Sequence, residues 1–251
     1  MNSARTPADA RRTPDVLGEV VLRAARGHHA FEGCVEQLAT AIRLGVFPRG
    51  SALPPERDLA SRMGVSRATL REGIAALRQA GMVSTTRGRG GGTVVSYRPM
   101  PPADDGSPGR SGRKDELMDC LTFRRVVEPG ACYVAAARSL SATERMLLTT
   151  SLAAVDHASD AADHRQADSR LHLAIATVTG SSMTIRSVTD VQSCLHDMLQ
   201  AIPVLDVSIE HSTRQHQAIV RAILDGEQTR ARRAMEQHCD DTAALLRGLL
   251  G

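Results

Sequence analysis

The stretch Leu59-Ala-Ser-Arg-Met-Gly-Val-Ser-Arg-Ala-Thr-Leu70 decides the fold of the N-terminal part of this chain. Gly64 supplies a tight turn, and Ser66 can cap the helix that follows. Ala60 is small enough for two helices to cross closely, and the apolar side chains at positions 59, 63, 65 and 70 bury the junction. This spacing is typical of a helix-turn-helix, whose second helix enters the major groove of DNA.

Patterns on either side of this stretch predict a winged helix-turn-helix domain over residues 30–95. Apolar periodicity and stop signals indicate three helices, over residues 30–45, 55–63 and 66–81. Two β-prone runs follow, residues 82–86 and 93–95, and a Gly-rich segment joins them into a small hairpin, the wing. Residues 1–29 form an N-terminal extension with a short amphipathic stretch.

The remainder of the chain is expected to be a separate helical domain. Residues 96–114 hold Pro, Gly, Ser and mixed charge without periodicity, which predicts a linker. Helical periodicity returns over residues 115–251, where Ser141 and Glu144 are spaced as a capping box. Aromatic residues make up only 2% of the chain, and it has no Trp. We therefore predict a mainly α protein whose second domain is an all-α bundle of six or seven helices.

Charge is divided unevenly between the two domains. Residues 1–95 carry 14 Lys and Arg against 8 Asp and Glu, whereas the rest carries 17 against 20. A basic N-terminal part and a slightly acidic remainder are expected when only one end meets a polyanion. Arg67 lies at the start of the predicted recognition helix and could donate two parallel hydrogen bonds to guanine, typically worth ~1–3 kcal/mol of discrimination.

Residues 30–95 resemble the GntR family, in its FadR-type branch. The resemblance rests on L-P-P-E-R-D-L-A at 53–60, G-V-S-R-A-T-L-R-E at 64–72 and G-M-V at 81–83, and the pair Arg49-Gly50 departs from the usual Pro-Gly. It implies that Arg57 and Arg67 help to read bases. It further implies that the DNA backbone is contacted by Ser66, Thr69 and Arg71. It also implies that the wing tip enters the minor groove through Arg87, Gly88 and Arg89.

Four polar residues of the second domain are spaced to meet in its interior. Asp168 and His172 are four residues apart, so they share one face of a helix. His216 and His238 lie on the apolar stripes of two other predicted helices. Buried polar groups without partners cost a few kcal/mol, so these four need one another or a metal ion.

The second domain resembles the FCD effector domain that accompanies such DNA-binding heads. The resemblance runs through residues 124–128, 168–172, 216–223 and 234–238, with Leu171 and Ser181-Ser182 as departures. It implies that Asp168, His172, His216 and His238 hold a divalent ion. Three imidazoles and a carboxylate suit Zn²⁺ or Ni²⁺, with Mn²⁺ as an alternative, and leave positions for a carboxylate effector or water. Arg124 could pair with the charge of that effector.

The other histidines and the cysteines suggest no further site. His196 could line the pocket, and we expect the rest at the surface: His28, His29, His157, His164 and His211. The five cysteines are scattered without C-x-x-C spacing, which argues against a disulfide framework or a thiolate zinc site.

Together these features predict a cytoplasmic, ligand-responsive transcription regulator that acts as a homodimer on an inverted-repeat operator. No signal peptide or run of ~20 apolar residues is present, so we expect no membrane partner. A repressor is favoured over an activator. A sensor of metal alone stays open as an alternative. A metallohydrolase is disfavoured, because there is no H-E-x-x-H and no obvious general base beside the ligands.

Overall fold

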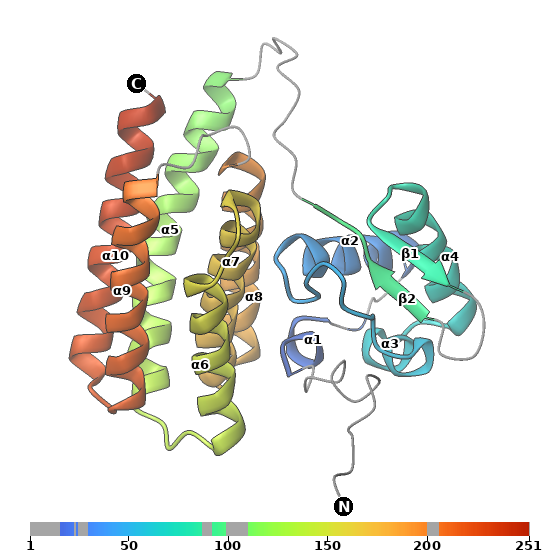
Figure 1. Ribbon diagram of the computed structural model, residues 1–251, viewed down its shortest axis with the longest axis horizontal. Coiled ribbons are helices and arrows are strands. Elements are labelled where there is room, and N and C mark those ends of the chain that lie inside the picture. The colour runs from blue at the N-terminus through green and yellow to red at the C-terminus, as the bar shows by residue number, and fades with distance from the viewer. Residues whose placement is uncertain are drawn as a thin grey trace, which may run out of the picture. The chain divides into compact units, whose positions relative to one another are not determined.

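The computed structural model describes residues 16–22, 24, 30–86, 92–98, 110–199 and 206–250. The chain divides into two compact units, residues 1–98 and 99–251, each of which is described by itself (Figure 1). Most described residues are helical, and the described strands form one two-stranded sheet in the first unit. The expected mainly α fold, with a small hairpin confined to the N-terminal part, is confirmed.

The first unit contains the winged helix-turn-helix. Its elements are α1 (Val16–Val21), α2 (Ala30–Arg43), α3 (Glu56–Met63), α4 (Arg67–Gln79), β1 (Val83–Thr86) and β2 (Gly92–Val95). The two strands are antiparallel, with Val83 opposite Val95 and Thr86 opposite Gly92. An isolated bridge from Ala52 to Val94 ties the loop before α3 to the hairpin.

The turn between α3 and α4 has the geometry that its sequence predicts. Gly64 ends α3 in the left-handed conformation, at φ +60°, which an L side chain rarely adopts. The hydroxyl of Ser66 accepts a hydrogen bond of 3.0 Å from the backbone N–H of Thr69 and so caps α4. The start of the recognition helix is thereby fixed.

Close packing in the first unit depends on small residues. A Cβ added at Gly73 on α4 would lie 3.2 Å from Sγ of Cys34, so this glycine lets α4 approach α2. A Cβ at Gly64 would lie 3.0 Å from Cβ of Ala24. Leu17 and Val21 of α1 are buried. The stretch expected as an N-terminal extension therefore contains a helix and contacts the turn of the helix-turn-helix.

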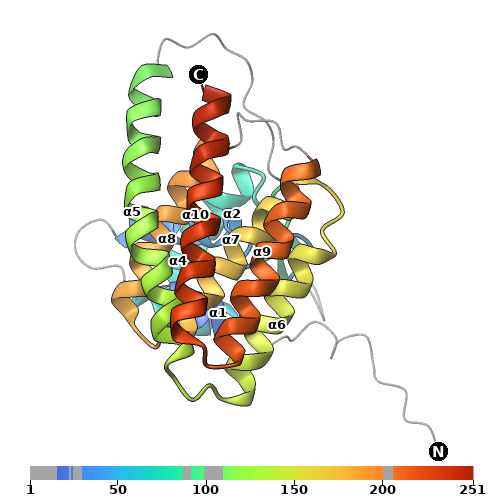
Figure 2. The ribbon, with the colours of Figure 1, turned by 90° about the vertical axis from the view of Figure 1, so that its left-hand side faces the viewer.

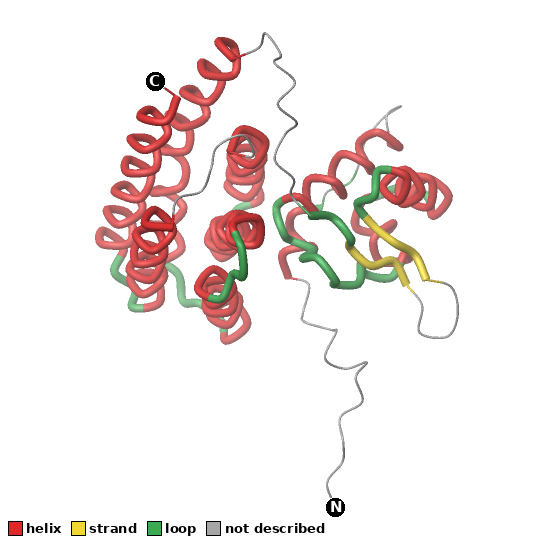
Figure 3. Tube along the Cα trace, turned by 45° about the horizontal axis from the view of Figure 1, so that its top comes forward, coloured by secondary structure: helices red, strands yellow, loops and turns green. Residues whose placement is uncertain are grey.

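The described residues of the second unit form six helices packed side by side. Figures 2 and 3 show their arrangement. They are α5 (Arg110–Ala136), α6 (Ala142–Asp156), α7 (Ala161–Val178), α8 (Ser182–Leu199), α9 (Asp206–Leu224) and α10 (Gln228–Leu250). Helix α5 packs against α10, α8, α7 and α9, while α6 lies between α7 and α9. The predicted capping box of Ser141 and Glu144 is present at the start of α6.

Helix α5 begins at Arg110, earlier than the start near Asp115 that the sequence predicts. Residues 110–116 contain no large apolar side chain, so periodicity could not locate this first part of the helix. None of the helices in the described part of the chain combines the length and apolarity that a bilayer span requires.

Candidate functional site

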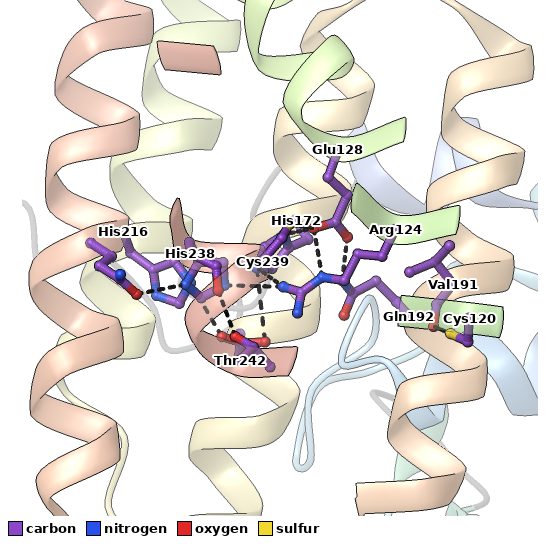
Figure 4. A network of polar contacts seen from close by, with 12 residues as sticks. Cys120, Arg124, Glu128, His172, Val191, Gln192, His216, His238, Cys239 and Thr242 are labelled. Carbon is purple, nitrogen blue, oxygen red and sulfur yellow. Dashed lines mark hydrogen bonds and ion pairs between the residues drawn. The ribbon is translucent and has the colours of Figure 1, made fainter. Parts of the chain in front are cut away.

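The four residues proposed as metal ligands converge inside the second unit. Asp168 and His172 come from α7, His216 from α9 and His238 from α10. One ligand atom from each lies within 4.8 Å of the others. Figure 4 shows His172, His216 and His238 turned toward a common centre. Tertiary packing thus brings together residues that are far apart in the sequence.

The three imidazoles are buried and lie close to one another. The ring centroids are 4.6 Å apart for His216 and His238, 5.3 Å for His172 and His238, and 5.4 Å for His172 and His216. Burial lowers the pKa of His216 to about 4 and also lowers the pKa of His238. Neutral imidazole is the form that donates a lone pair to a metal ion.

His216 is the residue whose nitrogens most clearly need a ligand. It has 0% exposure, and neither Nδ1 nor Nε2 makes a hydrogen bond within the described residues. Its closest charged neighbour is Asp168, whose Oδ1 lies 3.3 Å from Nε2. Burial raises the pKa of Asp168, but its electrostatic interactions with His172, His216 and the guanidinium of Arg124 outweigh burial, so the pKa is lowered overall. Asp168 is therefore a carboxylate.

Glu128 on α5 is a buried carboxylate beside this cluster, and it was not among the site residues predicted from the sequence. Its Oε2 accepts a hydrogen bond of 2.8 Å from Nε of Arg124, and its Oε1 accepts one of 2.6 Å from Nε2 of Gln192. Nδ1 of His172 lies 2.9 Å from Oε2. Burial alone would raise the pKa of Glu128, but Arg124 and His172 hold it well below its usual range. The four-residue spacing from Arg124 was the signal that could have identified it.

Arg124 lies at the centre of the site rather than at its edge. It is 2% exposed, and its Nη2 lies 3.0 Å from Nε2 of His238 and 3.3 Å from Nε2 of His172. A guanidinium can only donate, so both Nε2 atoms act as acceptors and the protons of these rings are on Nδ1. The lone pairs that Arg124 contacts are those that a metal ion would use.

A chain of side chains that the sequence analysis missed supports His238 from α9 and α10. Nδ1 of His238 donates to Oε1 of Gln215 at 3.1 Å, and Nε2 of Gln215 donates to Oδ2 of Asp241 at 2.7 Å. The same Oδ2 lies 3.0 Å from Nε2 of His211, while Gln237 donates to Oδ1. Because this network joins two helices, no sequence spacing would have predicted it.

The expectation that His164 lies at the surface is wrong. His164 is 8% exposed, because it sits one helical turn before Asp168 and shares the inward face of α7. His196 on α8 is buried as well. His157 is exposed, while His28 and His29 lie outside the described residues.

The donor set fits a divalent metal ion. Three imidazoles and one carboxylate within 4.8 Å of each other match the ligand types that Zn²⁺ and Ni²⁺ prefer. The two nitrogens of His216 without hydrogen bonds are costly in a buried place unless an ion accepts a lone pair. The hydrogen bond from Nδ1 of His238 to Gln215 fixes the tautomer of that ring, as groups behind the ligands do at metal sites.

The residues proposed to contact DNA lie at the start of α4 and on α3. Arg57, Ser66, Arg67 and Arg71 are exposed, and Thr69 is half-buried. Nε of Arg71 donates a hydrogen bond of 2.8 Å to Oε2 of Glu56, and Nε of Arg57 lies 3.3 Å from Oδ1 of Asp58. The proposed wing residues lie outside the described residues: Arg87, Gly88 and Arg89.

Comparison with known proteins identifies both domains. Residues 32–95 match the family of bacterial regulatory proteins named gntR, and residues 119–241 match the FCD domain. The chain is 29% identical over 234 residues to the transcriptional regulator RmpR of Mycobacterium gastri, covering 90% of this chain and 83% of that protein. It is 32% identical over 198 residues to an Escherichia coli protein described as an L-lactate dehydrogenase operon regulatory protein, covering 75% of each.

A further relative and one solved structure agree with this. The Glc operon transcriptional activator of Escherichia coli is 28% identical over 220 residues, which cover 82% of this chain and 85% of that protein. The structure of Escherichia coli McbR/YncC has the same fold at 14% identity, with a TM-score of 0.52 over 88% of this chain and 99% of that one. These relatives are regulators of transcription, not enzymes. The chain therefore belongs to the GntR family of transcription regulators, in the FadR-type branch that joins a GntR helix-turn-helix domain to a C-terminal FCD domain.

Proposed function

We propose that this regulator is a repressor whose binding to its operator is controlled by a small carboxylate held at a divalent metal ion in the second unit. The observation that carries the proposal is the convergence of Asp168, His172, His216 and His238 within 4.8 Å, with Arg124 among them. The name of one relative refers to an L-lactate dehydrogenase operon, and lactate is a small carboxylate.

The four clustered residues would bind the metal ion, and Arg124 would bind the carboxylate of the effector. Three imidazoles and Asp168 would hold Zn²⁺ or Ni²⁺, with Mn²⁺ as an alternative, and the ion would supply a Lewis acid for a carboxylate oxygen. When His172 and His238 give their Nε2 lone pairs to an ion, the guanidinium of Arg124 needs another acceptor. A carboxylate meets that need in a geometry that arginine favours.

On the DNA side, a homodimer in the cytoplasm would present two copies of α4 to an inverted-repeat operator. Arg67 is exposed at the first turn of α4, where a recognition helix reads base edges. Arg57 would read bases beside it, while Ser66, Thr69 and Arg71 contact the backbone and the wing residues Arg87, Gly88 and Arg89 reach the minor groove. Half-sites about one helical turn apart or closer would suit such a dimer.

The two sites must be coupled for the effector to act. A ligand releases a repressor from DNA only if it binds the DNA-incompetent arrangement more tightly than the competent one. The same coupling requires that operator DNA weakens binding of the effector by an equal factor.

A response to metal alone is the second candidate. This candidate is favoured because the guanidinium of Arg124 already contacts Glu128, His172 and His238. Its positive charge is then not needed to bind an organic acid. Under that reading the ion changes DNA affinity without a carboxylate.

Operator DNA selected from a random library tests the proposal. The affinity of the wild-type chain is measured while Zn²⁺ and then small 2-hydroxy acids are titrated separately. Release of DNA by an acid only when metal is bound supports the first candidate, and release by metal alone supports the second. Arg67→Ala should weaken operator binding and keep full metal content, whereas His216→Ala should lose the metal. Unchanged metal content in His216→Ala, or unchanged operator affinity in Arg67→Ala, contradicts the corresponding assignment.

A further inference from the structure

Two cysteines from different helices lie close together in the second unit. Cys120 on α5 is buried, and its Sγ donates a hydrogen bond of 3.7 Å to the backbone oxygen of Val191 on α8 (Figure 4). Cys194 follows Val191 by three residues, on the same side of α8, and is half-buried. The two thiols interact directly, and each changes the pKa of the other. The proposed function uses neither thiol.

Thioether side chains pack at the same place. Cys120 belongs to a cluster of buried apolar residues from α5, α8 and α10, and Cys194, Met118 and Met198 pack against that cluster. Met198 and Cys194 are four residues apart on α8, so they share one face of this helix. The two thiols and the thioether of Met198 are therefore three sulfur atoms, from two helices, that border the same part of the core.

The ligand types at this place match a soft metal ion and not a hard one. Among the described residues, neither Cys120 nor Cys194 belongs to a group of three or more His, Cys, Asp and Glu side chains that could share an ion. A structural zinc site needs four such ligands. Thiolate and thioether sulfur instead select Cu(I), which a small number of sulfur ligands can hold.

The protonation of the two thiols favours metal binding over a disulfide. Burial raises the pKa of Cys120 and also raises the pKa of Cys194. Oxidation proceeds through the thiolate, so thiols that keep their protons react slowly with peroxides. A metal ion can still bind to them, because each new bond to sulfur replaces an S–H bond and the proton leaves to solvent.

From this arrangement we propose that Cys120, Cys194 and Met198 form a second metal site of the chain, which binds a soft monovalent ion of the Cu(I) type. Two Cu–S bonds form as the two thiols each release a proton to solvent, the thioether adds a neutral ligand, and no electron is transferred. The site joins α5 to α8 one helical turn before Arg124. It does not depend on the proposed function, because it shares no ligand with the cluster of histidines.

Transfer of Cu(I) from a coloured chelator to the reduced full chain, without oxygen, tests this site. Cys194→Ala should lower the affinity for one copper ion by more than about 100-fold, since loss of a group that only supports a ligand already costs about 10- to 100-fold. Cys120→Ala should do the same, and Met198→Leu should cause a smaller loss. The matched controls are Cys34→Ala, which removes a cysteine of the first unit, and Met183→Leu, which changes an exposed methionine on α8.

X-ray absorption at the copper edge identifies the ligands. The wild-type chain should show sulfur around the ion, and this signal should be lost in Cys194→Ala and kept in Cys34→Ala. Circular dichroism checks that each variant is folded, and a count of free thiols in the unfolded chain checks that its cysteines are reduced. The spectrum of the wild-type chain alone tests the ligand type, so the proposal remains testable if a variant does not fold.

The outcomes separate this inference from the proposed function. Copper affinity that Cys120→Ala and Cys194→Ala leave unchanged, or a wild-type ion surrounded by nitrogen without sulfur, overturns the inference. A reduced wild-type chain that takes no copper from the chelator overturns it too. In each case Zn²⁺ binding at the histidines and release from the selected operator can still be measured, so the proposed function is decided by those measurements.

Discussion

Nδ1 of His172 on α7 lies 2.9 Å from Oε2 of Glu128 on α5, and both side chains are buried. This is an ion-pair distance and not a hydrogen bond. The proton of the imidazole is on Nδ1 because Nη2 of Arg124, which can only donate, lies 3.3 Å from Nε2. The Nε2 lone pair is then turned toward His216, His238 and Asp168, whose ligand atoms share the same centre. Glu128 also holds Arg124, and therefore one residue orients both the imidazole and the guanidinium.

Glu128→Gln should destabilise the second unit. The substitution removes the charge that balances buried Arg124, and breaking a buried ion pair costs roughly 3 kcal/mol or more. Urea unfolding measures the loss. Glu236→Gln is the control, since the ion pairs of Glu236 with Arg125 and Arg232 lie near the surface and are worth at most about 1 kcal/mol. Equal losses in the two variants would show that Glu128 has no special structural role.

Gln215→Leu should weaken metal binding without unfolding the protein. Oε1 of Gln215 accepts a hydrogen bond from Nδ1 of His238 and thereby leaves the lone pair of Nε2 available for the ion. Loss of such a support typically lowers metal affinity about 10- to 100-fold. Competition with a chelating dye measures the affinity. Gln217→Leu serves as the control on the same helix, because Gln217 points to Asp156 instead, and an equal effect there would remove the argument for Gln215.

The metal-free protein should lose stability as the pH falls from about 6.5 toward 4. Burial lowers the pKa of His216 to about 4, whereas the unfolded chain takes up the proton near pH 6.5. The unfolded state then binds more protons, so stability rises with pH across this window, by roughly 3 kcal/mol for His216. The lowered pKa of Asp168 acts in the same direction at still lower pH, where its carboxylate becomes protonated.

Urea unfolding at several pH values measures this dependence. His216→Asn removes one of the two histidines whose pKa burial lowers, the other being His238, and should reduce the slope of the curve between about pH 6.5 and pH 5. A wild-type curve as flat as that of His216→Asn would contradict the burial argument.

Glu56→Gln should raise the affinity for DNA of any sequence. It should therefore reduce the ratio of the affinity for the operator to the affinity for random DNA. The carboxylate of Glu56 binds Nε of Arg71 and adds a negative charge beside the proposed phosphate contacts. Its removal leaves one more positive charge to neutralise phosphates, so the salt dependence of binding becomes steeper. Fluorescence anisotropy with operator and random DNA over a range of salt measures both effects. Glu36→Gln on α2 is the control, and weaker binding by Glu56→Gln would contradict the prediction.

The sequence by itself determined the recognition unit, because the signals there are local. A left-handed glycine at position 64, a cap at Ser66 and apolar residues at helical spacing act within a few residues of each other. For the same reason the capping box at Ser141 and the pairing of Asp168 with His172 could be predicted. The start of helix α5 was not predicted, because only polar and small residues form its first turns. The burial of His164 was not predicted either.

Only the tertiary structure decided which side chains support the cluster of Asp168, His172, His216 and His238. Glu128 contacts His172 and Gln215 contacts His238, in each case from another helix. Gln192 holds Glu128 and Asp241 holds Gln215 in turn, at separations that no periodicity encodes. Which residues meet across a bundle depends on the rotation and axial offset of each helix, and packing of many side chains sets these together. The choice of His216 and His238 as inward residues was local, whereas their approach to Arg124 was a property of the whole bundle.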